Sequence, residues 1–284
     1  IGLSVLPTQA QTMLKGVNLA GAEFDSGTFW PNAAEFSYFN NKGMTVYRIP
    51  FKWERLQPQT NQDSDLSYFN ELVAVINTAT DGSSFAILDP HNYARYNNAL
   101  IGSASVPHSA FADLWSRLAS TFSDNPQVIF GLMNEPNSMP TEQWLISANQ
   151  AIAAIRMAGA NQLILVPGNA WTGAHSWEQN WYGTPNAEVM LGVIDSADNF
   201  AFDLHQYVDA DFSGTTDFCV ADHGATQLVA VSNWLRNHQK MGFLGEFAGA
   251  DNLSCHQSIV SVIDYMEKNS EVWLGWSLWA AGPQ

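Results

Sequence analysis

Short apolar runs alternate with stretches of helical periodicity along this chain of 284 residues. Several of the runs are apolar on both faces, as parallel strands covered by helices are. We expect strands at residues 16–23, 45–51, 84–91, 128–134, 163–167, 200–206, 242–247 and 272–279. Apolar residues spaced three and four apart predict helices at residues 69–76, 111–122, 145–155, 228–235 and 259–266.

Eight strands with intervening helices predict the α/β class and a (β/α)8 TIM barrel. Such barrels typically span about 250 residues, so residues 1–284 are expected to form a single domain. A doubly wound open sheet is the alternative, but it usually carries a Gly-rich phosphate loop after its first strand. Residues 18–23 contain no such pattern, and no linker, repeat or low-complexity tract marks a second domain.

The two ends of the chain carry separate expectations. The chain stops soon after the eighth predicted strand, so the barrel is expected to lack its final C-terminal helix. Truncation of a longer chain is our hypothesis, because residues 1–6 are too few to replace a helix of about 11–12 residues. Residues 1–10 fit either the tail of a clipped secretory leader or an extension that lies on the barrel.

Acidic residues outnumber basic ones by 27 to 11, which gives a net charge of −16. This charge argues against nucleic acids and anionic membranes as partners, whereas a neutral polysaccharide is not repelled. No apolar run approaches the roughly 18 residues of a membrane span.

The chain has two cysteines, Cys219 and Cys255, which fall in the predicted loops after successive strands. A disulfide between them is the preferred interpretation, and two free buried thiols are the alternative. A disulfide implies an oxidising, extracellular location for a secreted protein. Asn252-Leu253-Ser254 is a possible N-glycosylation site, which is consistent with secretion.

Polar or aromatic side chains gather where the predicted strands end. They are Arg48, His91, Asn92, Asn134, Glu135, His205, Tyr207, Glu246 and Trp279. Each has an ordinary structural explanation when taken alone, but in a barrel all these strand ends meet on the face that carries active sites. Retaining glycosidases need two carboxyl groups about 5–5.5 Å apart, and Glu135 and Glu246 are the candidates for such a pair.

Six motifs resemble one enzyme family. They are Arg48-Ile49-Pro50, Asp89-Pro90-His91-Asn92-Tyr93-Ala94-Arg95, Met133-Asn134-Glu135-Pro136, His205-Gln206-Tyr207, Gly245-Glu246-Phe247 and Trp279-Ala280-Ala281-Gly282-Pro283. In order and spacing they resemble secreted endo-β-1,4-glucanases of glycoside hydrolase family 5, and most of all the fungal-type cellulases. The resemblance runs from about residue 15 to residue 283. Pro90 departs from it, since an aliphatic residue is expected there, and is expected to shift the backbone beside His91.

The resemblance implies roles for the residues at the strand ends. Glu135 would be the acid/base and Glu246 the nucleophile. Arg48 and Tyr207 would support the nucleophile, and His205 would lie near the acid/base. Asn134 would bond the sugar 2-hydroxyl, with His91 and Asn92 as further binding or supporting residues.

Eight of the eleven tryptophans separate into two groups. Trp115, Trp144 and Trp234 lie in helical segments and are expected to pack in the core. Five others lie in loops or at strand ends, where an indole can stack on a sugar ring: Trp30, Trp171, Trp177, Trp181 and Trp279. Trp279 matches the family's platform beneath the cleaved sugar, and Trp171 follows the fifth predicted strand.

The leading hypothesis is a secreted, monomeric endo-β-1,4-glucanase that cleaves cellulose or β-glucan with retention and needs no metal or organic cofactor. β-Mannan and xylan are alternative substrates for the same chemistry. A metal-dependent barrel hydrolase would usually show two histidines one residue apart after the first strand, and these are missing. A non-catalytic carbohydrate-binding barrel would not need both glutamates.

Overall fold

A computed structural model describes residues 12–24 and 29–282. The expectations for residues 1–10 and for Pro283 concern residues outside these ranges. None of the helices in the described ranges combines the length and apolar character needed to cross a bilayer.

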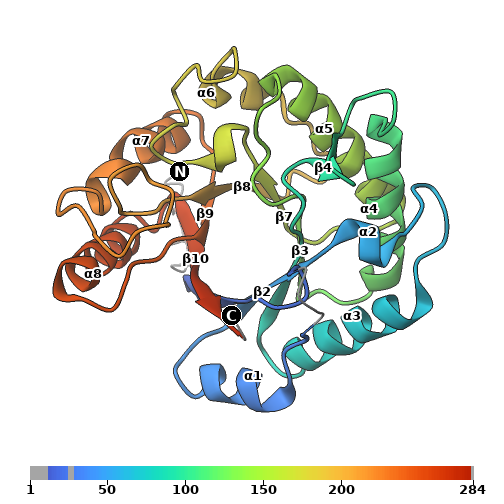
Figure 1. Cartoon of the computed structure of the whole chain (residues 1–284), viewed down its shortest axis with the longest axis horizontal. Coiled ribbons are helices and arrows are strands. Elements are labelled where there is room, and N and C mark those ends of the chain that lie inside the picture. The colour runs from blue at the N-terminus through green and yellow to red at the C-terminus, as the bar shows by residue number, and fades with distance from the viewer. Residues whose placement is uncertain (1–11, 25–28, 283–284) are drawn as a thin grey trace, which may run out of the picture.

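Among the described residues, eight parallel strands close into a barrel in the order β1-β10-β9-β8-β7-β6-β3-β2 (Figure 1). Their bounds are β1 Leu14–Leu19, β2 Val46–Phe51, β3 Phe85–Pro90, β6 Val128–Gly131, β7 Ile164–Pro167, β8 Phe200–His205, β9 Gly242–Glu246 and β10 Trp273–Ala281. The predicted barrel is therefore confirmed, with strand ends shifted by a few residues.

Helices surround the barrel in Figure 1. They are α1 Ala33–Asn40, α2 Trp53–Leu56, α3 Leu66–Ala79, α4 His108–Phe122, α5 Thr141–Met157, α6 Asn186–Val189, α7 Val229–Asn237 and α8 Leu253–Lys268. The five predicted helices correspond to α3, α4, α5, α7 and α8. Short 3-10 helices at Ala170–Thr172, Met190–Gly192 and Ala225–Leu228, and a hairpin of β4 Arg95–Tyr96 and β5 Ala99–Leu100, were not predicted.

Apolar packing fills two regions, one between the barrel and its helices and one inside the barrel. The three tryptophans expected to pack, Trp115, Trp144 and Trp234, are buried in the first region. The interior layer consists of one residue from each of six strands: Val46, Ile87, Ile129, Leu165, Ala201 and Phe243.

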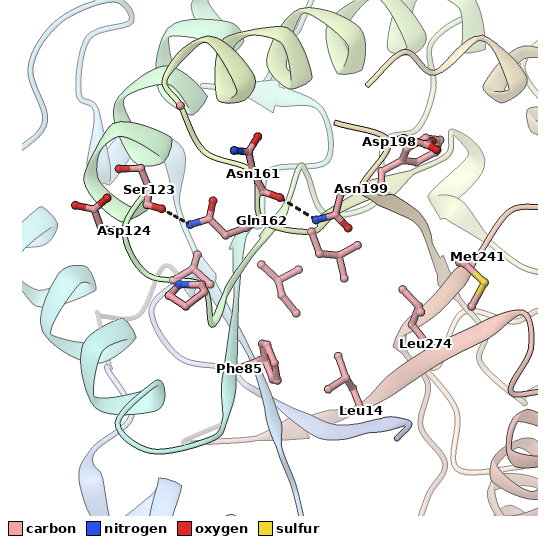
Figure 2. A pocket seen from close by; sticks show the side chains of 16 residues that line it. Leu14, Phe85, Ser123, Asp124, Asn161, Gln162, Asp198, Asn199, Met241 and Leu274 are labelled. Atoms are coloured by element: carbon pink, nitrogen blue, oxygen red, sulfur yellow. Dashed lines mark hydrogen bonds between the residues drawn. The ribbon is translucent and has the colours of Figure 1, made fainter. Parts of the chain in front are cut away.

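A cavity of about 780 Å³ lies at the end of the barrel where the strands begin. Leu14, Phe85 and Leu274 line it at the starts of their strands, with Met241 just before β9 (Figure 2). The cavity is therefore at the opposite end of the barrel from the polar residues singled out in the sequence.

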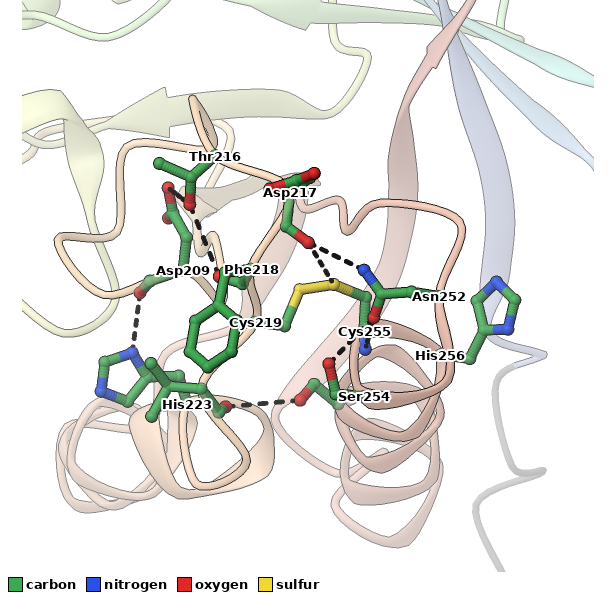
Figure 3. The surroundings of a disulfide bond; sticks show 12 residues. Asp209, Thr216, Asp217, Phe218, Cys219, His223, Asn252, Ser254, Cys255 and His256 are labelled. Atoms are coloured by element: carbon green, nitrogen blue, oxygen red, sulfur yellow. Dashed lines mark hydrogen bonds between the residues drawn. A yellow bond between two sulfur atoms is a disulfide. The ribbon is translucent and has the colours of Figure 1, made fainter.

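The disulfide between Cys219 and Cys255 is present (Figure 3). Cys255 lies in the first turn of α8 rather than in the loop before it. Asn252 is the N-cap of this helix, and its side-chain Oδ1 accepts a hydrogen bond from the Cys255 N–H. Its amide nitrogen donates to the Asp217 carbonyl oxygen and keeps one N–H for a glycan. Glycosylation at Asn252 stays a prediction.

Candidate active site

Two glutamates meet at the end of the barrel where the strands finish. Glu246 is the last residue of β9, and Glu135 follows β6. One carboxylate oxygen from each, together with a ring nitrogen of His205, lie within 4.8 Å of one another. Retaining glycosidases place their carboxyl groups about 5–5.5 Å apart and inverting ones about 6.5–9.5 Å. The observed separation fits a retaining pair.

Glu246 is buried and surrounded by hydrogen-bond donors. Arg48 Nη1 lies 2.6 Å from its Oε1, and the Tyr207 hydroxyl donates to its Oε2 at 2.8 Å. Burial alone would raise the pKa of Glu246, but the positive charges of His205 and Arg48 outweigh it and hold that pKa below its ordinary value. The geometry therefore keeps this carboxylate ionised.

Arg48 is the centre of the network. Besides Glu246 it contacts the side-chain oxygens of Asn18 at 2.9 Å and Asn134 at 2.8 Å, and Asp89 at 3.1 Å. Its burial opposes charge, but Asp89 and Glu246 raise its pKa above the ordinary value, so the guanidinium stays charged.

Asn18 and Asp89 were not among the predicted site residues. Asp89 is on β3, two residues before His91, so the two side chains lie on the same face of the strand. That spacing was a usable signal for Asp89. Nothing comparable in the sequence indicated that Asn18 would contact a guanidinium from β2.

His91 connects Arg48 to an aromatic surface. Its Nδ1 lies 2.8 Å from Asp89 Oδ2, and the Asn134 side-chain amide lies 3.0 Å from its Nε2. Because an amide NH2 can only donate, Nε2 accepts from Asn134, and Nδ1 faces the Asp89 carboxylate. On its other side the ring stacks on Trp279, with ring centroids 5.3 Å apart.

Glu135 is more accessible than Glu246, with 16% of its side chain exposed against 5%. Its Oε1 lies 2.8 Å from His205 Nδ1. Burial would lower the pKa of His205, but the nearby carboxylates of Glu246 and Glu135 raise it above the ordinary value. Glu135 and His205 are therefore placed to share a proton.

Asn92 does not join this network. Its side-chain oxygen accepts from the Trp53 backbone N–H at 2.8 Å, and its amide nitrogen donates to Glu54. The side-chain oxygen and nitrogen of Asn92 therefore both bind the first turn of α2. The structure gives Asn92 a local structural role.

Four of the five candidate stacking tryptophans have exposed ring surface, and one does not. Trp279 is partly exposed beside His91, and Trp171 is 40% exposed, with the rings of Trp181 and Tyr182 next to it. Trp30 lies against Tyr68 of α3.

The expectation for Trp177 was wrong. Its side chain is buried, and its ring packs edge-on against Phe202 and Trp234, between the barrel and α7. The loop after β7 folds back onto the barrel, so this large apolar ring contributes to the core.

Within the described ranges, Glu135, His205 and Glu246 are the one cluster whose ligand atoms are of the type and spacing for a metal ion. The contact between Glu135 and His205 has hydrogen-bond length, and the buried Arg48 guanidinium already balances Glu246. We therefore assign Glu135 and His205 to proton transfer, and Glu246 to its ion pair with Arg48.

Comparison with known proteins gives a consistent picture. The family model Cellulase (glycosyl hydrolase family 5) matches residues 7–282. Endo-beta-1,4-glucanase A of Emericella nidulans is 38% identical, over 98% of this chain and 86% of the relative. Endoglucanase 1 of Robillarda sp. is 38% identical, over 96% of this chain and 74% of the relative.

Two solved structures have the same fold. XacCel5A in complex with cellopentaose is 47% identical with a TM-score of 0.93, over 95% of this chain and 90% of that one. The endo-beta-1,4-glucanase Xac0029 from Xanthomonas axonopodis pv. citri is 42% identical with a TM-score of 0.93, over 96% of this chain and 89% of that one.

Proposed function

The chain belongs to glycosyl hydrolase family 5, the family of the cellulases, and we propose that it is an endo-β-1,4-glucanase that cleaves internal bonds with retention. One observation carries the proposal. A buried, cation-paired carboxylate and a more accessible one that contacts an imidazole lie within 4.8 Å of each other.

In the first step, the Glu246 carboxylate attacks the anomeric carbon while Glu135 gives its proton to the departing glycosidic oxygen. The product is a glycosyl ester on Glu246 and a shortened glucan with a free hydroxyl. The lowered pKa of Glu246 supports its role as nucleophile, because the group must be ionised before attack.

In the second step, Glu135 takes a proton from water, and the resulting hydroxide-like oxygen attacks the same carbon. The ester bond breaks, Glu246 leaves as a carboxylate, and the sugar keeps its original configuration. The accessibility of Glu135 supports this role, since water must reach it.

Asn134 is suited to bind the sugar 2-hydroxyl. Arg48 holds its oxygen, and His91 accepts from its amide nitrogen. The amide nitrogen carries two hydrogens, so one N–H remains for substrate. A hydrogen bond there strengthens as positive charge develops on the sugar ring. The exposed rings of Trp279 and Trp171 are the proposed stacking surfaces for glucose units.

Two experiments test the function. The first compares kcat/KM on carboxymethylcellulose, glucomannan and xylan, and a preference for glucan is expected. A hundredfold preference for mannan or xylan would overturn the substrate class and keep the chemistry. The second uses a 2-fluoroglycoside label, which is expected on the peptide that contains Glu246. A label elsewhere would overturn the assignment of the nucleophile.

The proposal includes the protein's setting. The disulfide supports secretion, because disulfides persist in oxidising compartments. A single chain supplies every proposed catalytic group, which supports action as a monomer. Sedimentation analysis is expected to give the monomer mass, and a larger species would contradict it.

A further inference from the structure

A further carboxylic acid, Asp203, lies deeper in the barrel than the proposed catalytic groups. Asp203 is on β8, two residues before His205, so both side chains point to the barrel interior. Asp203 is 2% exposed, and its Oδ1 is buried without a hydrogen-bond partner among the described residues. His205 Nε2, the ring nitrogen that does not contact Glu135, is also buried without one. Buried polar atoms without partners are costly and need an explanation.

The packing of β9 leaves room for this carboxylate. A methyl group on Gly245 would lie 2.2 Å from Asp203 Oδ1, so the residue before Glu246 has to be glycine for Asp203 to fit. An apolar side chain at position 203 would avoid the desolvation of a carboxyl group. A structural role therefore does not account for an acid at this position.

Charged groups face Asp203 from four strands. Arg48 of β2, Asp89 of β3, His205 of β8 and Glu246 of β9 all act on it. Glu135 faces His205 from the loop after β6, and β7 contains no titratable residue. Burial, together with Asp89 and Glu246, raises the pKa of Asp203 to about 6 against the opposing effect of His205 and Arg48.

We propose that Asp203 is a positioning residue that acts through His205 and keeps a proton on the Glu135–His205 pair as the pH rises. The carboxylate adds a negative charge behind the imidazole, and this charge favours retention of the proton that the pair shares. The effect extends activity on the alkaline side, where a glycosidase loses its general acid. The inference rests on the proposed function, because it concerns the same acid/base.

The test is the pH profile of kcat/KM for Asp203→Asn on a soluble glucan. Asparagine keeps the shape of the side chain and removes its charge. The alkaline limb is expected to move to lower pH by about one unit, the size of shift that a nearby charge produces. Near the optimum, kcat/KM is expected to stay within a few-fold of the wild type. An unmoved alkaline limb, or a uniform loss at every pH, overturns the proposal.

Asp195→Asn is the matched control. Asp195 is a buried carboxylate that binds Arg156 through both oxygens, remote from the glutamates in the loop before β8. Its replacement is expected to lower stability and leave the pH profile unchanged. The control separates the loss of a buried acid in general from the loss of Asp203.

Histidine NMR of the wild-type protein provides a second readout that depends on neither turnover nor the folding of a variant. The His205 ring resonances are expected to show an additional inflection when Asp203 ionises, in the range to which burial raises its pKa, about 6. Absence of that inflection overturns the proposal. Failure of the wild type to cleave any glucan would overturn the proposed function and leave the NMR result intact.

Discussion

The two ends of the barrel are built from the same strands but use polar side chains differently. Where the strands begin, Gln162 donates to the backbone carbonyl of Ser123, and Asn199 donates to that of Asn161 (Figure 2). Gln162 also donates to the backbone carbonyl of Phe122. Where the strands finish, side chains bond one another across the barrel, as Arg48 of β2 does with Glu246 of β9.

This difference implies that one end of the barrel contributes mainly to stability and the other end to catalysis. At the first end, polar groups bond nearby backbone carbonyls and an apolar layer packs inside the barrel beside the cavity, so these residues serve to keep the barrel folded. At the second end, charged groups are buried against one another, which costs desolvation and shifts their pKa values. Changes at the second end should therefore alter catalysis, and changes at the first should alter stability alone.

Glu246→Gln should give the largest effect. The variant keeps the hydrogen-bonding shape but cannot form the glycosyl ester, so kcat is expected to fall by about 10⁴-fold or more. Binding of cellotetraose, measured by calorimetry, is expected to persist. The exposed Glu271→Gln serves as the control and should retain full activity. Undiminished hydrolysis by Glu246→Gln would mean that the nucleophile is misassigned.

Arg48→Met should give the next largest effect and also move the acid limb. His205 and Arg48 hold the pKa of Glu246 below its ordinary value against burial, so the wild type should keep its activity into the acidic range where an ordinary glutamate protonates. Without the guanidinium, burial dominates, Glu246 protonates at higher pH, and the acid limb should move upward. We expect kcat to fall by about 10²–10³-fold, as when other electrostatic stabilisers are removed.

Arg48→Lys isolates the charge from the geometry. Lysine keeps a positive charge near Glu246 but cannot also reach Asn18 and Asn134 in the same directions. The acid limb should therefore stay close to that of the wild type while kcat falls. Equal acid limbs in Arg48→Met and the wild type would contradict the electrostatic explanation.

Much of this contrast could be predicted from the sequence, and the reason is geometric. Parallel strands of a barrel finish on one face, so the residues that follow each apolar run had to meet there. Arg48, Asn134, Glu135, His205, Tyr207 and Glu246 were placed in this way. The family resemblance placed Arg48 and Tyr207 beside Glu246, and His205 near Glu135. The other contacts, such as that of Asn18 with Arg48, could not be predicted, because they depend on how the strands lie beside one another.

The errors have specific causes. Trp177 was expected to be exposed, but its burial depends on how the loop after β7 turns back, which no periodicity encodes. Helix α1 was not predicted although Asn32 and Glu35 form a capping box at its start, a signal that the sequence does contain. Asp203 stands within an apolar strand, and the unpaired state of its oxygen is visible only in three dimensions.

Leu165→Ala tests the first end of the barrel. Leu165 lies in the interior layer on β7, a strand that carries none of the proposed catalytic groups. Its truncation should lower the free energy of unfolding by about 2–5 kcal/mol. Urea denaturation measures this loss, and kcat should stay within twofold at temperatures where the variant is folded. A tenfold loss of kcat in the folded variant would show that the two ends are coupled.

Asp209→Asn should give the smallest effect on the chemistry, because Asp209 contacts neither glutamate and acts only through the turn that packs on Tyr207. The Asp209 carboxylate accepts hydrogen bonds from the backbone N–H groups of Gly214 and Thr215. Gly214 has a φ of +69°, and a methyl group there would lie 2.4 Å from the Tyr207 ring, so this turn packs directly against the tyrosine that donates to Glu246.

Asparagine at position 209 keeps one acceptor oxygen and loses the other, which should loosen the turn by about 1 kcal/mol. We expect kcat to fall about threefold with KM unchanged, because Tyr207 supports the nucleophile and does not bind the polymer. Asp211→Asn, an exposed change in the same loop, is the control. A larger loss in Asp211→Asn than in Asp209→Asn would show that the loop acts through its surface, not through Tyr207.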